Sequence, residues 1–230
     1  MKKSILSQIK DKAGKLIESQ LLNAGNVLNV RSWEESRLIE IELHLPSVNM
    51  RDWRQIPYIK FRVDGFSFRD YSPFGWDEET STCSILIDAD HQGPGSSWAK
   101  KLKSGDSVSY FRPESTRQFP HPTDFVVGLG DASSVGHLLA LQQLTVPVSR
   151  LDMAVVLDKT QSTNLLRDNF SPAINTMSSY DELADWLIKQ QYAIANTSFY
   201  INGNHQLVVA LRKLLKKMGH EQIRVKGFWS

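Results

Sequence analysis

Residues 125–134 read Phe-Val-Val-Gly-Leu-Gly-Asp-Ala-Ser-Ser, a short apolar strand that runs directly into the small, polar opening of a helix. After this stretch, apolar strands and helices alternate to the end of the chain. The predicted strands are 125–129, 151–157, 197–201 and 223–228, and the predicted helices are about 134–144, 180–190 and 204–218. This alternation is typical of a parallel α/β sheet that is covered by helices on both faces.

The preceding part of the chain has a period of two instead. In residues 38–45, Leu-Ile-Glu-Ile-Glu-Leu-His-Leu, the side chains of Ile39, Ile41, Leu43 and Leu45 share one face and the polar residues share the other. Further short strands are expected at 58–63, 84–87 and 108–111. Such spacing favours an antiparallel barrel or sandwich. The predicted fold class is therefore α+β with two domains, an antiparallel β-barrel followed by an α/β nucleotide-type domain.

A proline-rich stretch at 112–123 separates the two patterns and is interpreted as a linker. Residues 5–22 form an amphipathic pattern with several lysines, which suits a helix that caps the domain or one that lies on a membrane surface. The first alternative is favoured because the apolar face is narrow and lacks Trp and Phe. The predicted division is an N-terminal helix at 1–23, a barrel domain at 24–117 and an α/β domain at 118–230.

Composition excludes several classes of protein. The 230 residues include 27 Lys and Arg and 25 Asp and Glu, a formal net charge of +2, which is too small for a dedicated nucleic-acid binder. The single cysteine, Cys83, excludes an internal disulfide and a multi-cysteine metal site, and it fits a reducing compartment. The six His lack metal-ligand spacing, so no bound metal is expected. No apolar run reaches a membrane span, and the start lacks the apolar region of a signal peptide, so a cytoplasmic protein without membrane insertion is expected.

Two short motifs could hold a flat ligand with a phosphate tail. In Arg69-Asp-Tyr-Ser-Pro73, expected after a barrel strand, Arg69 and Tyr71 point the same way, so the ring could stack on Tyr71 and the phosphate could pair with Arg69. Ser72 could reach a ring nitrogen. The alternative is an ordinary strand end with a surface ion pair.

The second motif, Gly93-Pro-Gly-Ser-Ser-Trp-Ala99, predicts a helix that runs through Lys103, with Ser96 or Ser97 as its N-cap. Its free N–H groups would suit a pyrophosphate, although a plain capped helix is the common reading of such a string. Residues 128–134 form a possible nucleotide loop at the carboxyl end of a strand, but they do not match G-x-G-x-x-G.

Taken in order, these pieces resemble the siderophore-interacting protein family, the cytoplasmic FAD-dependent ferric-siderophore reductases related to ferredoxin–NADP reductases. The resemblance covers about 31–229. The segments that carry it are Arg69 to Pro73 with Trp76-Asp77, Gly93 to Ala99, Ser104-Gly-Asp106, Gly130-Asp-Ala-Ser133, Asn202-Gly-Asn204 and Gly227-Phe-Trp229.

The resemblance implies non-covalent FAD, reduced by NADH, NADPH or a ferredoxin, that passes single electrons to a ferric siderophore. No side chain is assigned as catalytic, because the flavin carries the chemistry. A monomer is expected. The implied cofactor-binding residues are Arg69, Tyr71, Ser72, His91, Gly93, Gly95, Ser96, Ser97, Asp131, Ser133 and Trp229, and the implied substrate-binding residues are Lys60 and Arg112.

The chain departs from the family pattern at several points. Asn204 replaces the family Glu, and the family's basic tail after the last motif is absent. The basic residue that the family has just after the Gly-Pro at the end of the barrel is replaced in Arg112-Pro-Glu114, where Arg112 or Arg117 could substitute for it. Asp158 would favour NADH and the adjacent Lys159 would oppose it, so the donor preference stays open. Lys60 could also be a solvated strand lysine. Two other functions remain: a non-catalytic carrier of siderophore or flavin, and a general flavin-dependent ferredoxin reductase.

Overall fold

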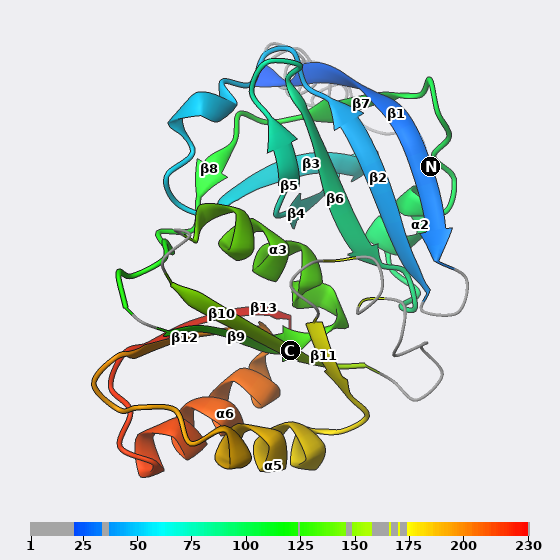
Figure 1. Cartoon of the computed structure of the whole chain (residues 1–230). Helices are drawn as coiled ribbons and strands as arrows, with labels where there is room; N and C mark the ends of the chain where they lie inside the picture. The colour runs from blue at the N-terminus through cyan, green and yellow to red at the C-terminus, as the bar shows by residue number, and fades with distance from the viewer. Residues whose placement is uncertain are drawn as a thin grey trace, which may run out of the picture.

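The computed structural model describes residues 21–33, 37–123, 125–145, 149–157, 166, 170 and 174–229. The helix predicted at 5–22 lies outside the described residues apart from its last two, and so does Asp158. Two sheets form the molecule, with helix α3 (Val135–Leu144) between them (Figure 1). In the described part of the chain, no helix is long and apolar enough to cross a membrane.

The first sheet has eight strands, and every strand pair in it is antiparallel, which confirms the predicted barrel. Its order is β4-β3-β7-β1-β2-β6-β5, with β8 on the side of β3. The strands are β1 (Asn23–Trp33), β2 (Leu38–His44), β3 (Pro57–Asp64), β4 (Ser67–Tyr71), β5 (Phe74–Asp77), β6 (Thr82–Asp88), β7 (Ser107–Tyr110) and β8 (Glu114–Ser115). Short helices η1 (Met50–Asp52) and α2 (Pro94–Ala99) lie in the connections.

Alternation of apolar and polar residues decides which face of the barrel is buried. Ile59, Phe61 and Val63 on β3 are at most 8% exposed, and the predicted apolar face of β2 is equally buried. Cys83 on β6 belongs to this core, and complete burial raises the pKa of its thiol to about 12. The sequence pattern therefore predicted this core correctly.

The second sheet is parallel, with the order β11-β10-β9-β12-β13. Its elements are β9 (Phe125–Asp131), η2 (Ala132–Ser134), β10 (Arg150–Val156), β11 (Ile174–Met177), α5 (Tyr180–Gln190), β12 (Thr197–Asn204), α6 (His205–Lys217) and β13 (Ile223–Trp229). One face packs against α3, and the other packs against α5 and α6. The prediction of a parallel sheet with helices on both faces is confirmed.

Arg69 and Tyr71 lie on β4, an extended strand that follows β3 and pairs with it, as the sequence predicted. The prediction for helix α2 was wrong. Helix α2 has six residues, begins with Pro94 and uses Gly93 as its N-cap, so neither Ser96 nor Ser97 caps it and it stops short of Lys103. Proline suits the first helical turn because its missing N–H would have no partner there.

Candidate functional site

A cavity of about 690 Å³ lies where the barrel meets the parallel sheet. Its walls come from β3, β4, the end of β6, helix α2, the start of α3 and the last residues of β13. This volume is within the usual range of small-molecule and cofactor sites. The carboxyl end of β9 also leads to this region through Ser133, as expected for a ligand site in an open parallel sheet.

Tyr71 forms an aromatic wall of the cavity. Its ring is stacked on Trp98 of α2, with 6.1 Å between centroids and a 10° interplanar angle. Burial raises the pKa of Tyr71 to about 12, so its hydroxyl keeps its proton. A Cβ at Gly95 would collide with the Tyr71 hydroxyl and lie 3.4 Å from Arg69 Cγ. Both side chains therefore lie against the backbone of α2, on the same side of β4, as the sequence predicted.

Ser72 follows Tyr71 and contacts a buried histidine. Ser72 Oγ lies 2.9 Å from His137 Nδ1, and His137 Nε2 lies 2.7 Å from Gln118 Oε1. His137 is 2% exposed, and burial together with the nearby charge of Lys226 lowers its pKa to about 3. His137 is therefore neutral at physiological pH.

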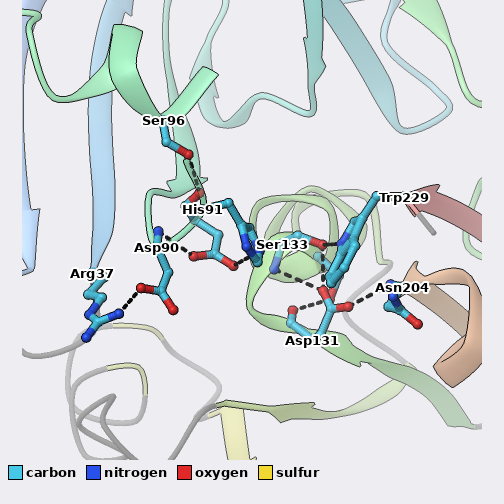
Figure 2. A network of polar contacts seen from close by, with 10 residues as sticks. Arg37, Asp90, His91, Ser96, Asp131, Ser133, Asn204 and Trp229 are labelled. Carbon is cyan, nitrogen blue, oxygen red and sulfur yellow. Dashed lines mark hydrogen bonds and ion pairs between the residues drawn. The ribbon is translucent and has the colours of Figure 1, made fainter. Parts of the chain in front are cut away.

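The turn after β9 is closed by its own hydrogen bonds, as Figure 2 shows. Asp131 accepts from the backbone N–H of Ser133 at 3.0 Å, from Ser133 Oγ at 2.5 Å and from the backbone N–H of Asn204 at 2.6 Å. Burial raises the pKa of Asp131 despite these bonds. Trp229 Nε1 donates to Ser133 Oγ at 3.1 Å, which ties the end of β13 to this turn.

A second group of polar contacts comes from the loop after β6. His91 Nε2 lies 3.4 Å from an oxygen of Asp88, and the His91 ring lies 5.2 Å from the Trp229 ring. Burial raises the pKa of Asp88. Arg37 pairs with Asp90 beside this group (Figure 2). His91, from the loop after β6, and Trp229, from β13, thus meet at the cavity.

Charged residues of both signs stand at the edge of the cavity on β3 and β4. Lys60 Nζ is 3.9 Å from an oxygen of Asp70, its cross-strand neighbour, and both side chains are about half exposed. Lys226 Nζ lies 4.7 Å from the centroid of the Tyr58 ring, and Tyr58 donates to Glu114. Burial lowers the pKa of Lys226, while Asp70 and Glu114 oppose this shift.

The structure gathers most of the predicted site residues around one cavity. Those that line it are Lys60, Arg69, Tyr71, Ser72, His91, Gly93, Gly95, Ser96, Ser133 and Trp229. Ser97, Asp131 and Arg112 do not line it. Ser97 is exposed on α2, and Asp131 lies behind Ser133 with its carboxylate used inside the turn.

Sequence reasoning missed other residues that line the cavity, chiefly Tyr58, His137 and Phe228. The feature of the sequence that could have pointed to His137 is the glycine before it, Gly136. A Cβ at Gly136 would lie 3.3 Å from the carbonyl oxygen of Ser72, so the glycine marks the point where α3 approaches the barrel backbone.

Comparisons with known proteins agree on the fold. The sequence matches no protein-family profile and no curated protein sequence. Among solved structures, the siderophore-interacting protein SipS from Aeromonas hydrophila matches with a TM-score of 0.70 and 15% identity, over 90% of this chain and 91% of that one. A siderophore utilization protein from T. fusca also matches with a TM-score of 0.70 and 15% identity, over 90% and 92% of the two chains.

A ferredoxin NADP+ reductase from Neisseria gonorrhoeae, solved with bound FAD and NADP, matches with a TM-score of 0.68 and 18% identity, over 90% of this chain and 98% of that one. Sequence identity this low establishes the arrangement of the chain in space and not its chemistry. Each of the three comparisons covers 90% of this chain. The chain therefore shares the two-domain fold of these three solved structures.

Proposed function

We propose that the protein is an FAD-dependent oxidoreductase that reduces ferric siderophores and so releases ferrous iron in the cytoplasm. The observation that carries this proposal is one cavity that joins Arg69, Tyr71 and Ser72 of the barrel domain to Ser133 and Trp229 of the α/β domain. A cofactor there would touch both halves of the molecule.

The residues present fit FAD. Tyr71 offers a ring that Trp98 already holds in place, Arg69 offers a cation for a phosphate, and Gly93 and Gly95 keep the α2 backbone free of side chains on the cavity side. Ser72 and Ser96 add hydroxyl groups. Helix α2 is too short for a strong dipole, so Arg69 has the larger share in holding the phosphates. When bound, FAD supplies the step between two-electron donors and one-electron acceptors.

The α/β domain would bring the electron donor, NADH, NADPH or a ferredoxin. Asn204, which stands where the family has Glu, caps α6 by accepting from the N–H groups of Gln206 and Leu207. Its side chain is thus occupied by the helix start, and a role in nucleotide binding is not needed to explain it. The preference between NADH and NADPH remains a prediction, because Asp158 lies outside the described residues.

Lys60 is the proposed contact for an anionic ferric siderophore, because it is half exposed at the edge of the cavity. Lys226 is the second cation in this place. Arg112 is the weaker candidate, since it does not line the cavity.

The test is to load the purified protein with FAD and to follow the flavin absorbance without oxygen. Bleaching by NADH, NADPH or reduced ferredoxin, followed by reoxidation with a ferric siderophore, is the expected result. A protein that cannot take up FAD would defeat the proposal. FAD that no donor bleaches would indicate a carrier, and bleached FAD that reduces ferredoxin but no siderophore would indicate a general reductase.

A further inference from the structure

Three side chains connect the proline-rich linker to the wall of the cavity. Gln118 lies in that linker, His137 lies on α3 and Ser72 lies between β4 and β5. The distances are 2.7 Å from Gln118 Oε1 to His137 Nε2 and 2.9 Å from His137 Nδ1 to Ser72 Oγ. His137 and Gln118 are 2% and 6% exposed, so water does not compete for the bond between them, whereas Ser72 is half-buried. Of these three hydrogen-bonded side chains, Ser72 and His137 line the cavity.

The orientation of the Gln118 amide, with Oε1 toward His137, sets the direction of both hydrogen bonds. A carbonyl oxygen can only accept, so His137 Nε2 carries the hydrogen in the bond to Gln118. A neutral imidazole has one N–H group, which leaves Nδ1 with a lone pair. Ser72 therefore donates its hydroxyl hydrogen to His137, and only the oxygen lone pairs of Ser72 face the cavity.

The surrounding backbone holds this arrangement in place. The carbonyl oxygen of Gln118 accepts from the N–H of Ile56 at 2.7 Å, and its N–H donates to Thr116 Oγ1 at 3.3 Å. Gly136 lets α3 approach the backbone of Ser72. The rings of Phe228 and His137 pack edge to face, with 5.5 Å between centroids. The hydrogen-bond chain is therefore formed before any ligand arrives.

We infer that Gln118 and His137 fix Ser72 as a hydrogen-bond acceptor toward the cavity, so that the site favours a ring with an N–H group over the same ring with a bare nitrogen. The inference rests on the proposed function, in which Ser72 reaches a ring nitrogen of FAD. That nitrogen is bare in oxidised FAD and carries a hydrogen in reduced FAD. His137 is a positioning residue, because it acts on the cofactor through Ser72.

The experiment measures the dissociation constants of oxidised and reduced FAD in four proteins: wild type, His137→Phe, Ser72→Ala and the double variant. His137→Phe keeps a ring against Phe228 and frees Ser72 to donate to the bare nitrogen. The preference for reduced over oxidised FAD should fall by up to about tenfold, the equivalent of one hydrogen bond. For a two-electron couple this is a midpoint potential lower by about 30 mV. His44→Phe, a histidine that does not line the cavity, is the matched control and should change neither constant.

The double variant shows whether His137 acts through Ser72. In the Ser72→Ala background, His137→Phe should leave the ratio of the two dissociation constants unchanged, because the hydroxyl that it orients is gone. An equal effect of His137→Phe with and without the Ser72 hydroxyl would overturn the inference.

A measurement on the unmodified protein does not depend on any variant folding. Nitrogen-15 NMR of labelled histidine, assigned through bonds in FAD-free protein at neutral pH, should show His137 with its hydrogen on Nε2. A hydrogen on Nδ1 would overturn the inference. FAD that binds with the same ratio in wild type and His137→Phe would overturn it while the proposed function stands, whereas wild-type protein that binds neither form of FAD would overturn the proposed function itself.

Discussion

Arg69 is the residue with the most direct test in the proposed FAD site. It lies on β4 beside Tyr71 and lines the cavity. Replacing Arg69 with Ala removes a charge-assisted contact to phosphate, so FAD should bind about 10- to 100-fold more weakly. Fluorescence titration of FAD measures this change. Arg31→Ala, on β1 and away from the cavity, is the control and should retain wild-type affinity; equal affinity of Arg69→Ala would move the phosphate site elsewhere.

Lys60 and Asp70 allow a paired test of substrate charge. Lys60→Ala should raise the apparent KM for an anionic ferric siderophore several-fold, and Asp70→Asn should lower it, because Asp70 offsets the charge of Lys60 at 3.9 Å. Both effects should shrink at high salt. Steady-state kinetics at two salt concentrations, with FAD content measured in each variant, decide the matter. Unchanged KM values in both variants would leave Lys60 as a solvated strand lysine.

His137 should give the folded protein a measurable pH dependence. Its pKa is about 3 when folded and near 6.5 when unfolded, so the unfolded chain binds more protons between these values. The stabilisation that neutral His137 contributes is fully present above pH 6.5. As the pH falls below that value, the free energy of unfolding decreases by about 1.4 kcal/mol per pH unit. Asp88 and Asp131, whose pKa values are raised, have the opposite effect at acidic pH.

Comparison of wild type with His137→Phe isolates the contribution of this histidine from those two carboxyl groups. Urea unfolding between pH 4.5 and 7 should show that the stability of the variant relative to wild type increases as the pH falls. Parallel curves for the two proteins would mean that His137 takes up a proton in the folded state.

At the scale of elements, the start of α6 makes a prediction about Asn204. The side chain of Asn204 accepts from two N–H groups of the first turn, so Asn204→Ala should reduce the free energy of unfolding by about 1 kcal/mol. Asn204→Ser should retain most of this cap. Urea denaturation measures both, and Ser179→Ala, which removes the cap of α5, provides a comparison of similar size. Equal stability of Asn204→Ala and wild type would assign the asparagine to another role.

Elements with a strong period could be predicted from the sequence, and short elements could not. The alternation in β2 and β3 and the long helices α5 and α6 carry their own signal, and each formed where predicted. β11 has polar residues at two of its four positions, and β8 is a two-residue strand inside the linker. Such strands depend on pairing with a neighbour, which a local pattern does not contain.

The site could be predicted where a motif sits on one element. Arg69, Tyr71 and Gly95 were found because their spacing on β4 and α2 already indicates a ligand. His137 and Lys226 reach the same cavity only because α3 and β13 pack against the barrel. That arrangement depends on contacts between residues far apart in sequence, so no single stretch could reveal it.

For the whole molecule, one of the hydrophobic clusters contains residues of both sheets. Trp33, Leu38 and Phe74 of the barrel pack in the same cluster as Leu138 of α3 and Met153 of β10. Gln143 of α3 also donates to the carbonyl of Trp76 at 2.9 Å and accepts from its N–H at 3.2 Å, which satisfies the edge strand β5. Tyr200 of β12 donates to the carbonyl of Phe119 in the linker at 2.6 Å.

We therefore expect the barrel and the parallel sheet to unfold together. Calorimetry should show one transition whose calorimetric and van't Hoff enthalpies agree. Leu138→Ala, which removes a fully buried side chain from the shared cluster, should lower the transition temperature of both halves equally. Two separate transitions, or a variant that shifts only one of them, would show that each half is stable alone.

The buried position of Cys83 has a practical consequence for measuring motion. Cys83 is the single cysteine of the chain, and its thiol is 1% exposed with a pKa raised to about 12, so it should not react with maleimide dyes in the folded protein. Cysteines introduced at Phe66, on the β3–β4 turn, and at Ile194, beside the parallel sheet, are both at well-exposed positions. A donor and acceptor dye on these two sites would report, without removal of the native thiol, whether the halves of the molecule close on each other when FAD is added.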